Sequence, residues 1–119
     1  MESQPLGIQE RTFAFAIRVV GLCDSLNSEP GVSRTLSNQL LRSGTSIGAN
    51  VEEAHGSQSK ADFTAKMYIA CKEARESLYW LRLLIATNVV SKSKLQPLTD
   101  EANELVAILT TIVKKTKSS

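Results

Sequence analysis

The sequence predicts an all-α protein with a single domain over residues 1–119, folded as an antiparallel up-down-up-down four-helix bundle. Apolar residues recur at steps of three and four residues in four separate segments, which is the period of amphipathic helices. The segments between them are short and rich in the glycine, proline and serine typical of turns. Aromatic residues make up only 5% of the chain, and such an aliphatic composition suits helices better than sheets.

The four helices are expected at about residues 8–27, 33–56, 60–88 and 93–116. The first carries two neighbouring apolar stripes, one of Phe13, Ile17 and Val20 and one of Phe15, Val19, Leu22 and Leu26. Because two adjacent stripes are apolar, this helix should contact more than one partner. Residues 27–31, which include Pro30 and Gly31, are expected to stop this helix, and residues 1–7 to form a loose tail.

The second helix places two glycines, Gly44 and Gly48, on one face. Each glycine costs a helix interior about 0.5–1 kcal/mol relative to alanine, so a pair on one face indicates that another helix packs very close. The sequence leaves open whether that helix belongs to the same chain or to another copy. Ser33 is expected to cap the N-terminus of this helix, and Gly56 to end it.

The third helix repeats small and apolar residues at alternating steps of four and three: Phe63, Met67, Ala70, Ala74, Ser77, Leu81 and Leu84. This period predicts packing along the whole helix, from a start between Ser59 and Asp62 to Asn88. The fourth helix is expected to begin near Ser93. Pro97 would then lie within its first turn, where few backbone donors have partners.

Composition favours an ordinary globular protein without a membrane segment. The net charge of +2 is too small to indicate nucleic-acid binding by itself. Cys23 and Cys71 form no CxxC pair and are expected to be reduced and buried. The N-terminus does not resemble a secretory signal, and no run of 18 apolar residues occurs, so a cytoplasmic location is expected.

The sequence holds no convincing catalytic, metal or cofactor site. His55 is the only histidine; it follows Glu52 in an E-x-x-H pattern, but a di-metal bundle needs a second such pattern. Glu73 and Glu76 lie one turn apart, and the neighbouring Lys72 and Arg75 favour ion pairs over acid–base chemistry. We therefore expect no catalytic residues, no metal and no cofactor.

A polar stripe follows the second helix beside its glycines, formed by Arg42, Ser46, Asn50 and Glu53. It is either a solvated face or part of an interhelical hydrogen-bond network that reaches Glu73 and Glu76. Trp80 lies on a mixed face of the third helix, which makes it a candidate subunit contact. Tyr68, Tyr79 and Trp80 are interpreted as packing or interface residues rather than base-stacking platforms.

Basic residues are spread over all four helices, and a bundle can gather such residues into one patch. Phosphate contacts need only positive charge at accessible positions. The candidates for nucleic-acid contact are Arg11, Arg18, Arg75, Arg82, Lys114, Lys115 and Lys117. A solvated surface that only confers solubility is the alternative interpretation.

The middle third of the chain resembles the four helix bundle protein family, also called the 23S ribosomal RNA intervening-sequence protein family. The matching positions are Ser46-Ile47, Asn50, Glu53, Phe63, Ile69-Ala70, Lys72-Glu73-Ala74, Glu76 and Trp80-Leu81. The chain departs from the family pattern after Glu53, where Ala54 stands near the position of a common glycine and Gly56 follows two residues later.

This resemblance implies a homopentamer of four-helix subunits with a role on RNA or DNA. The family includes reading frames within insertions of ribosomal RNA genes. It also includes the accessory variability protein of diversity-generating retroelements, a basic pentamer that binds nucleic acid and a reverse transcriptase. No established catalytic residues carry over. The function expected is that of a non-enzymatic, nucleic-acid-associated accessory factor; the alternative is a protein-interaction scaffold that binds no nucleic acid.

Overall fold

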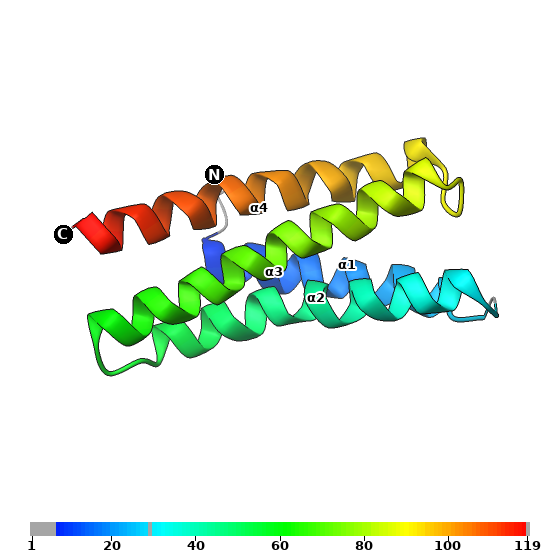
Figure 1. Cartoon of the computed structure of the whole chain (residues 1–119). Coiled ribbons are helices and arrows are strands. Elements are labelled where there is room, and N and C mark those ends of the chain that lie inside the picture. The colour runs from blue at the N-terminus through cyan, green and yellow to red at the C-terminus, as the bar shows by residue number, and fades with distance from the viewer. Residues whose placement is uncertain (1–6, 29, 119) are drawn as a thin grey trace, which may run out of the picture.

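The computed structural model describes residues 7–28 and 30–118, which form four helices and no strand. The helices are α1 (Ile8–Leu26), α2 (Val32–His55), α3 (Lys60–Ala86) and α4 (Lys92–Ser118). Successive helices run in opposite directions (Figure 1), so the all-α four-helix fold predicted from periodicity is confirmed. The loose tail expected at residues 1–7 falls, apart from Gly7, outside the described residues.

The helices pack mainly on their neighbours in sequence. Helix α2 packs against α1 and α3, and α3 packs against α4, while α1 and α4 meet over a much smaller region. The backbones of α1 and α3 do not approach each other closely, and the two helices occupy opposite corners of the bundle (Figure 1). The principal extents of 46 × 37 × 20 Å describe a flattened bundle. Closure between α1 and α4 is therefore the weakest packing contact of the fold.

The core is formed by apolar residues of all four helices, including the stripe of Phe15 and Val19 on α1. Its largest fully buried side chains are Phe15, Leu40, Ile47, Met67, Leu81, Leu84, Leu95, Leu105 and Leu109. Cys23 and Cys71 are free and buried, as predicted. Burial raises the pKa of the Cys23 thiol, and a hydrogen bond with Ser37 opposes this shift in part.

The two glycines of α2 allow α1 to approach within the same chain. A Cβ atom placed on Gly44 would lie 2.9 Å from both methyl carbons of Val19, closer than van der Waals contact permits. A Cβ atom on Gly48 would lie 3.3 Å from the backbone oxygen of Thr12. The glycine face is therefore the α1–α2 contact, which answers the question left open by the sequence.

The helix boundaries differ from the predictions at several ends. The prediction that Ser33 caps α2 is wrong, because the helix begins one residue earlier, at Val32. The residue before the helix is Gly31, with a φ of 87°, a conformation that glycine adopts without strain. This conformation changes the direction of the chain at the start of α2. Helix α3 begins as expected, since Ser59 Oγ accepts a hydrogen bond from the Asp62 amide at 3.0 Å.

The end of α3 and the start of α4 also shift. Helix α3 ends at Ala86, and Asn88 adopts a φ of 60°, so the helix cannot extend to Asn88 as predicted. Helix α4 begins at Lys92, which makes Pro97 its sixth residue. The prediction that Pro97 lies within the first turn is therefore wrong. This proline has no N–H to donate to the carbonyl four residues earlier, that of Ser93.

Candidate nucleic-acid interface

The outer edges of α3 and α4 meet along a line that we call the α3–α4 seam. The two helices are antiparallel neighbours, and Cys71 Sγ lies 3.3 Å from Thr110 Oγ1 across the seam. This contact sets the register between the helices. The first third of α3 therefore lies beside the last third of α4, and the end of α3 lies beside the start of α4 (Figure 1).

Four of the predicted basic residues lie along this seam. Arg75 and Arg82 are exposed and follow Tyr68 at steps of seven residues, so they share one edge of α3. Lys114 and Lys117 are exposed and lie one turn apart near the end of α4. The ammonium of Lys117 reaches across the seam to within 5.1 Å of the Tyr68 ring centre.

Two of the three acids of α3 are turned away from this edge. Glu73 and Glu76 both form ion pairs with Arg42 of α2, on the opposite flank of the helix. Arg75, Arg82 and Lys114 make no ion pair with any described residue. The seam is therefore a row of uncompensated positive charges, the arrangement that attracts a phosphate backbone.

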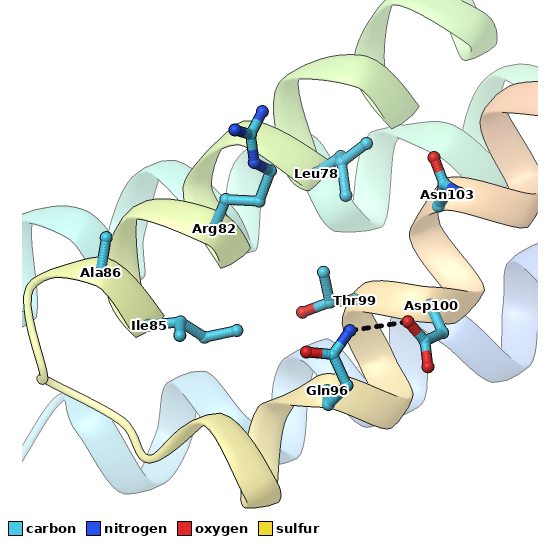
Figure 2. Close-up of a pocket in the computed structure, with 8 residues that line it drawn as sticks. All are labelled: Leu78, Arg82, Ile85, Ala86, Gln96, Thr99, Asp100 and Asn103. Carbon is cyan, nitrogen blue, oxygen red and sulfur yellow. Dashed lines mark hydrogen bonds between the residues drawn. The ribbon is translucent and has the colours of Figure 1, made fainter.

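At one end of the seam lies a hollow of about 510 Å³. Figure 2 shows Leu78, Arg82 and Ile85 on the α3 side and Gln96, Thr99 and Asp100 on the α4 side. Gln96 Nε2 donates a 2.7 Å hydrogen bond to Asp100 Oδ1, which holds this acid beside its own helix. The hollow thus combines an apolar wall with one cation, one carboxylate and several neutral groups able to form hydrogen bonds.

Arg11 does not belong to this surface. Its Nη2 atom lies 2.6 Å from Glu101 Oε1 and 2.6 Å from Glu104 Oε2. Hydrogen bonding to these two carboxylates, Glu101 first, raises the pKa of Arg11 above its usual value. Its charge serves to tie α1 to α4, where the helices make the least contact.

The two other predicted basic residues also lie off the seam. Arg18 is exposed on α1 and lines a shallow hollow together with Lys94 of α4. Lys115 is exposed on α4 beside Ala107 and Thr111. Of the seven basic residues selected from sequence, the structure therefore gathers Arg75, Arg82, Lys114 and Lys117, and places the other three elsewhere.

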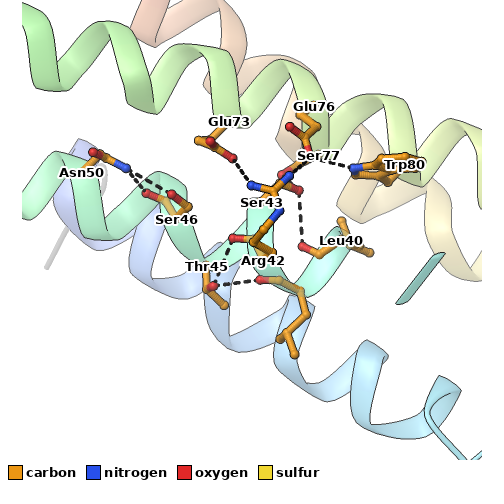
Figure 3. A network of polar contacts seen from close by, with 11 residues as sticks. Leu40, Arg42, Ser43, Thr45, Ser46, Asn50, Glu73, Glu76, Ser77 and Trp80 are labelled. Atoms are coloured by element: carbon orange, nitrogen blue, oxygen red, sulfur yellow. Dashed lines mark hydrogen bonds and ion pairs between the residues drawn. The ribbon is translucent and has the colours of Figure 1, made fainter. Parts of the chain in front are cut away.

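The polar stripe of α2 contacts α3 at both ends and forms hydrogen bonds within α2 in the middle. Figure 3 shows Arg42 paired with Glu73, at 3.4 Å, and with Glu76. Glu76 also accepts a 3.0 Å hydrogen bond from the indole N–H of Trp80. This part of the stripe therefore forms an interhelical network, and the indole N–H of Trp80 takes part in it within one subunit.

The rest of the stripe makes local or exposed contacts. Asn50 Nδ2 donates to the Ser46 carbonyl at 2.9 Å, within α2. Glu53 pairs with Lys66 of α3 at 3.1 Å near the surface. Beneath the network, Ser77 Oγ donates a buried 2.9 Å hydrogen bond to a serine of α2, Ser43 (Figure 3). Sequence reasoning missed this pair, although both residues fall at helical steps within apolar stripes.

Another surface, which the sequence analysis did not select as a site, lies on α1. Phe13 is 67% exposed, Ile17 58% and Val20 49%, and the three follow one stripe of the helix. The neighbouring stripe, with Phe15 and Val19, is buried against the other helices. The two stripes were visible in the sequence, but only the structure shows which of them lacks a partner within the chain.

No group of three or more potential metal ligands occurs among residues 7–28 and 30–118. His55 Nδ1 lies 2.9 Å from the Val51 carbonyl, and its ring packs edge-on against Phe63. Within the same part of the chain, no helix is both long and apolar enough to span a membrane.

The fold and this surface define a four-helix bundle with a basic edge. The chain belongs to the family of 23S rRNA-intervening sequence proteins, whose model matches residues 4–111. It is also similar to a protein of unknown function from the S23 ribosomal protein family of Bacteroides thetaiotaomicron, solved by crystallography. The two are 41% identical, with a TM-score of 0.84, over 91% of this chain and 99% of the other. No curated protein matches the chain.

Proposed function

We propose that this protein is a non-enzymatic, homo-oligomeric accessory factor that binds RNA through the α3–α4 seam. The observation that carries the proposal is the row of basic residues along the seam, none of which forms an ion pair with a described residue: Arg75, Arg82, Lys114 and Lys117. The chain belongs to a family named after an intervening sequence of 23S rRNA, and this favours RNA as the ligand. Cytoplasmic RNA or a ribonucleoprotein is the partner that this chemistry fits.

The charge distribution explains how a net charge of +2 is compatible with this function. Many acids are used in contacts between helices, such as Glu73 and Glu76 with Arg42 and Glu101 with Arg11. The bases of the seam have no such partners among the described residues. Binding to phosphates depends on local potential rather than on total charge.

The test compares two triple variants with the same change in net charge. Arg75→Gln/Arg82→Gln/Lys114→Gln removes charge from the seam, and Arg18→Gln/Arg34→Gln/Lys94→Gln removes it from exposed positions elsewhere. Binding of a labelled RNA hairpin is measured by fluorescence anisotropy at several salt concentrations. Each lost phosphate contact lowers the slope of log K against log salt by about 0.7–0.9, so the seam variant should lose about 2 units.

The control triple variant is expected to bind with nearly the wild-type slope. Equal losses in both variants would mean that RNA responds only to total charge, and the seam assignment would be wrong. If wild-type protein binds no RNA at low salt, the nucleic-acid function itself is wrong. The alternative, a scaffold that binds proteins only, would then be the better proposal.

The homo-oligomeric part of the proposal is supported by the exposed stripe of Phe13, Ile17 and Val20. Apolar side chains at this density on one helix face mark an interface rather than a solvated surface. The expected assembly is a pentamer. A ring of five copies is built from head-to-tail contacts, in which the stripe of one subunit meets a different surface of the next.

Light scattering after size exclusion tests this assembly. A pentamer has a mass of five times 13.0 kDa, about 65 kDa. Ile17→Glu places a charge in the centre of the stripe and should dissociate the particle. Val32→Glu, a charge at an equally exposed apolar position outside the stripe, should leave the mass unchanged. A wild-type monomer would contradict the proposal of an oligomer.

A further inference from the structure

Tyr68 is an exposed aromatic residue close to two lysines, at the end of the seam opposite the hollow shown in Figure 2. Its side chain is 49% exposed. The ammonium of Lys117 lies 5.1 Å from the ring centre, and that of Lys72 lies 5.7 Å from it. The expectation from sequence was a packing or interface role, but the structure leaves the ring accessible between two cations from different helices.

A hollow of about 500 Å³ lies beside this ring, within the range of about 300–1,000 Å³ that small-ligand sites occupy. It is lined by Lys60, Ala61, Thr64, Ala65 and Tyr68 of α3 and by Thr116 and Lys117 of α4. The two alanines are small, and their place on the outer edge of α3 gives a flat object access to the tyrosine ring. The hollow is therefore open, mostly apolar and rimmed by lysines.

We propose that this hollow binds one unpaired nucleotide of a nucleic-acid strand that follows the α3–α4 seam. The base stacks on the Tyr68 ring, and Lys72 and Lys117 contact the phosphates on either side of it. This inference rests on the proposed function and adds a preference for single strands. A duplex offers phosphates to the seam but keeps its base faces covered, so it cannot use Tyr68.

Stacking requires that a base replace one ammonium on the face of the ring. An exposed cation–π contact contributes about 2- to 5-fold to an equilibrium, whereas a base stacked on an aromatic ring contributes about 5- to 100-fold. The exchange therefore favours the base. Lys72 and Lys117 are long and exposed, so each ammonium can move from the ring to a neighbouring phosphate without rearranging the backbone.

The seam continues from this hollow in the direction that a strand would follow. Lys114 lies one turn before Lys117 on α4, and Arg75 lies two turns beyond Tyr68 on α3. Arg82 follows two turns further, at the hollow shown in Figure 2. The aromatic site and the basic row thus form one continuous path, with stacking at one end and phosphate contacts along it.

The experiment measures fluorescence anisotropy of a short labelled RNA of about eight nucleotides, of the matched DNA strand, and of the duplex form of the same RNA. Wild-type protein should bind both single strands more tightly than the duplex. Tyr68→Ala should weaken single-strand binding about 5- to 100-fold and change duplex binding less than about 2-fold. Tyr68→Phe keeps the ring and should bind as wild type does.

Tyr79→Ala is the control, because Tyr79 lies on the same helix, between Arg75 and Arg82, and is 56% exposed, but its ring packs edge-on against Trp80 at 5.1 Å and does not line the hollow. It should bind single strands with wild-type affinity. If Tyr68→Ala binds single strands as wild type does, the inference is wrong while RNA binding by the seam stands. If wild-type protein binds neither single strands nor duplex, both the inference and the proposed function are wrong.

Discussion

Replacement of Gly44 by alanine tests how closely α1 and α2 are packed. The new Cβ atom would lie 2.9 Å from both methyl carbons of Val19 and 3.3 Å from its Cβ. Val19 is fully buried, and its branched side chain has one strongly preferred rotamer in a helix, so it cannot turn aside at low cost. The helices must separate locally or accept strain.

The net effect follows from two opposing magnitudes. Alanine is better than glycine in a helix interior by about 0.5–1 kcal/mol, whereas overpacking a tight core costs about 1–3 kcal/mol. The difference of these two ranges runs from about 0 to 2.5 kcal/mol, so we expect Gly44→Ala to lower the free energy of unfolding by up to about 2.5 kcal/mol. Gly21 of α1 is the matched control, because a Cβ atom placed on it would have nothing within 4 Å. Gly21→Ala should raise stability by about 0.5–1 kcal/mol.

Urea unfolding followed by circular dichroism measures these differences. A third variant sharpens the test: Val19→Ala removes both methyl groups that the new Cβ atom would meet. In that background Gly44→Ala should cost clearly less than in the wild-type protein, because the helix preference remains and both 2.9 Å contacts are gone, leaving only the 3.3 Å contact with the Cβ atom of residue 19. If Gly44→Ala stabilises the wild-type protein, or destabilises both backgrounds equally, the close approach of α1 to α2 at Gly44 is wrong.

Two further predictions concern the α1–α4 closure and the buried thiols. Arg11→Met should lower the free energy of unfolding by about 1 kcal/mol, because Glu101 loses its partner where packing is weakest. Arg18→Met, at an exposed position of the same helix, should have little effect in the same urea experiment. Neither Cys23 nor Cys71 should react with a thiol reagent in the native protein, and both should react after unfolding. Because the folded-state pKa of Cys23 is raised, its contribution to stability is complete below the ordinary thiol pKa of 9.0 and declines as the pH rises further. Wild-type protein should therefore lose more stability than Cys23→Ala between about pH 8 and pH 10; an equal loss would contradict burial of a neutral thiol.

The sequence by itself determined the four helices and most of the core. Helical periodicity is a local property, since residues three and four apart share a face whatever the rest of the chain does. That is why Phe15, Met67 and Leu81 could be placed in apolar stripes before any helix was docked. Helix ends were less predictable, because Gly31 and Asn88 set them through backbone conformations that residue preferences only suggest.

The candidate site depended on information that lies between helices. Arg75 and Lys114 are 39 residues apart in sequence and lie on two different helices, and nothing local indicates that they share one seam. Arg11 was a reasonable phosphate contact by sequence, but its partner Glu101 lies 90 residues away.

Only the tertiary structure decided which basic residues stay unpaired and which apolar stripe of α1 stays uncovered. Both outcomes depend on how far each helix is rotated about its axis and on the register in which it meets its neighbours. Those two quantities are set by side-chain packing across the whole bundle, as at Gly44 and Val19, and not by the pattern of any single helix.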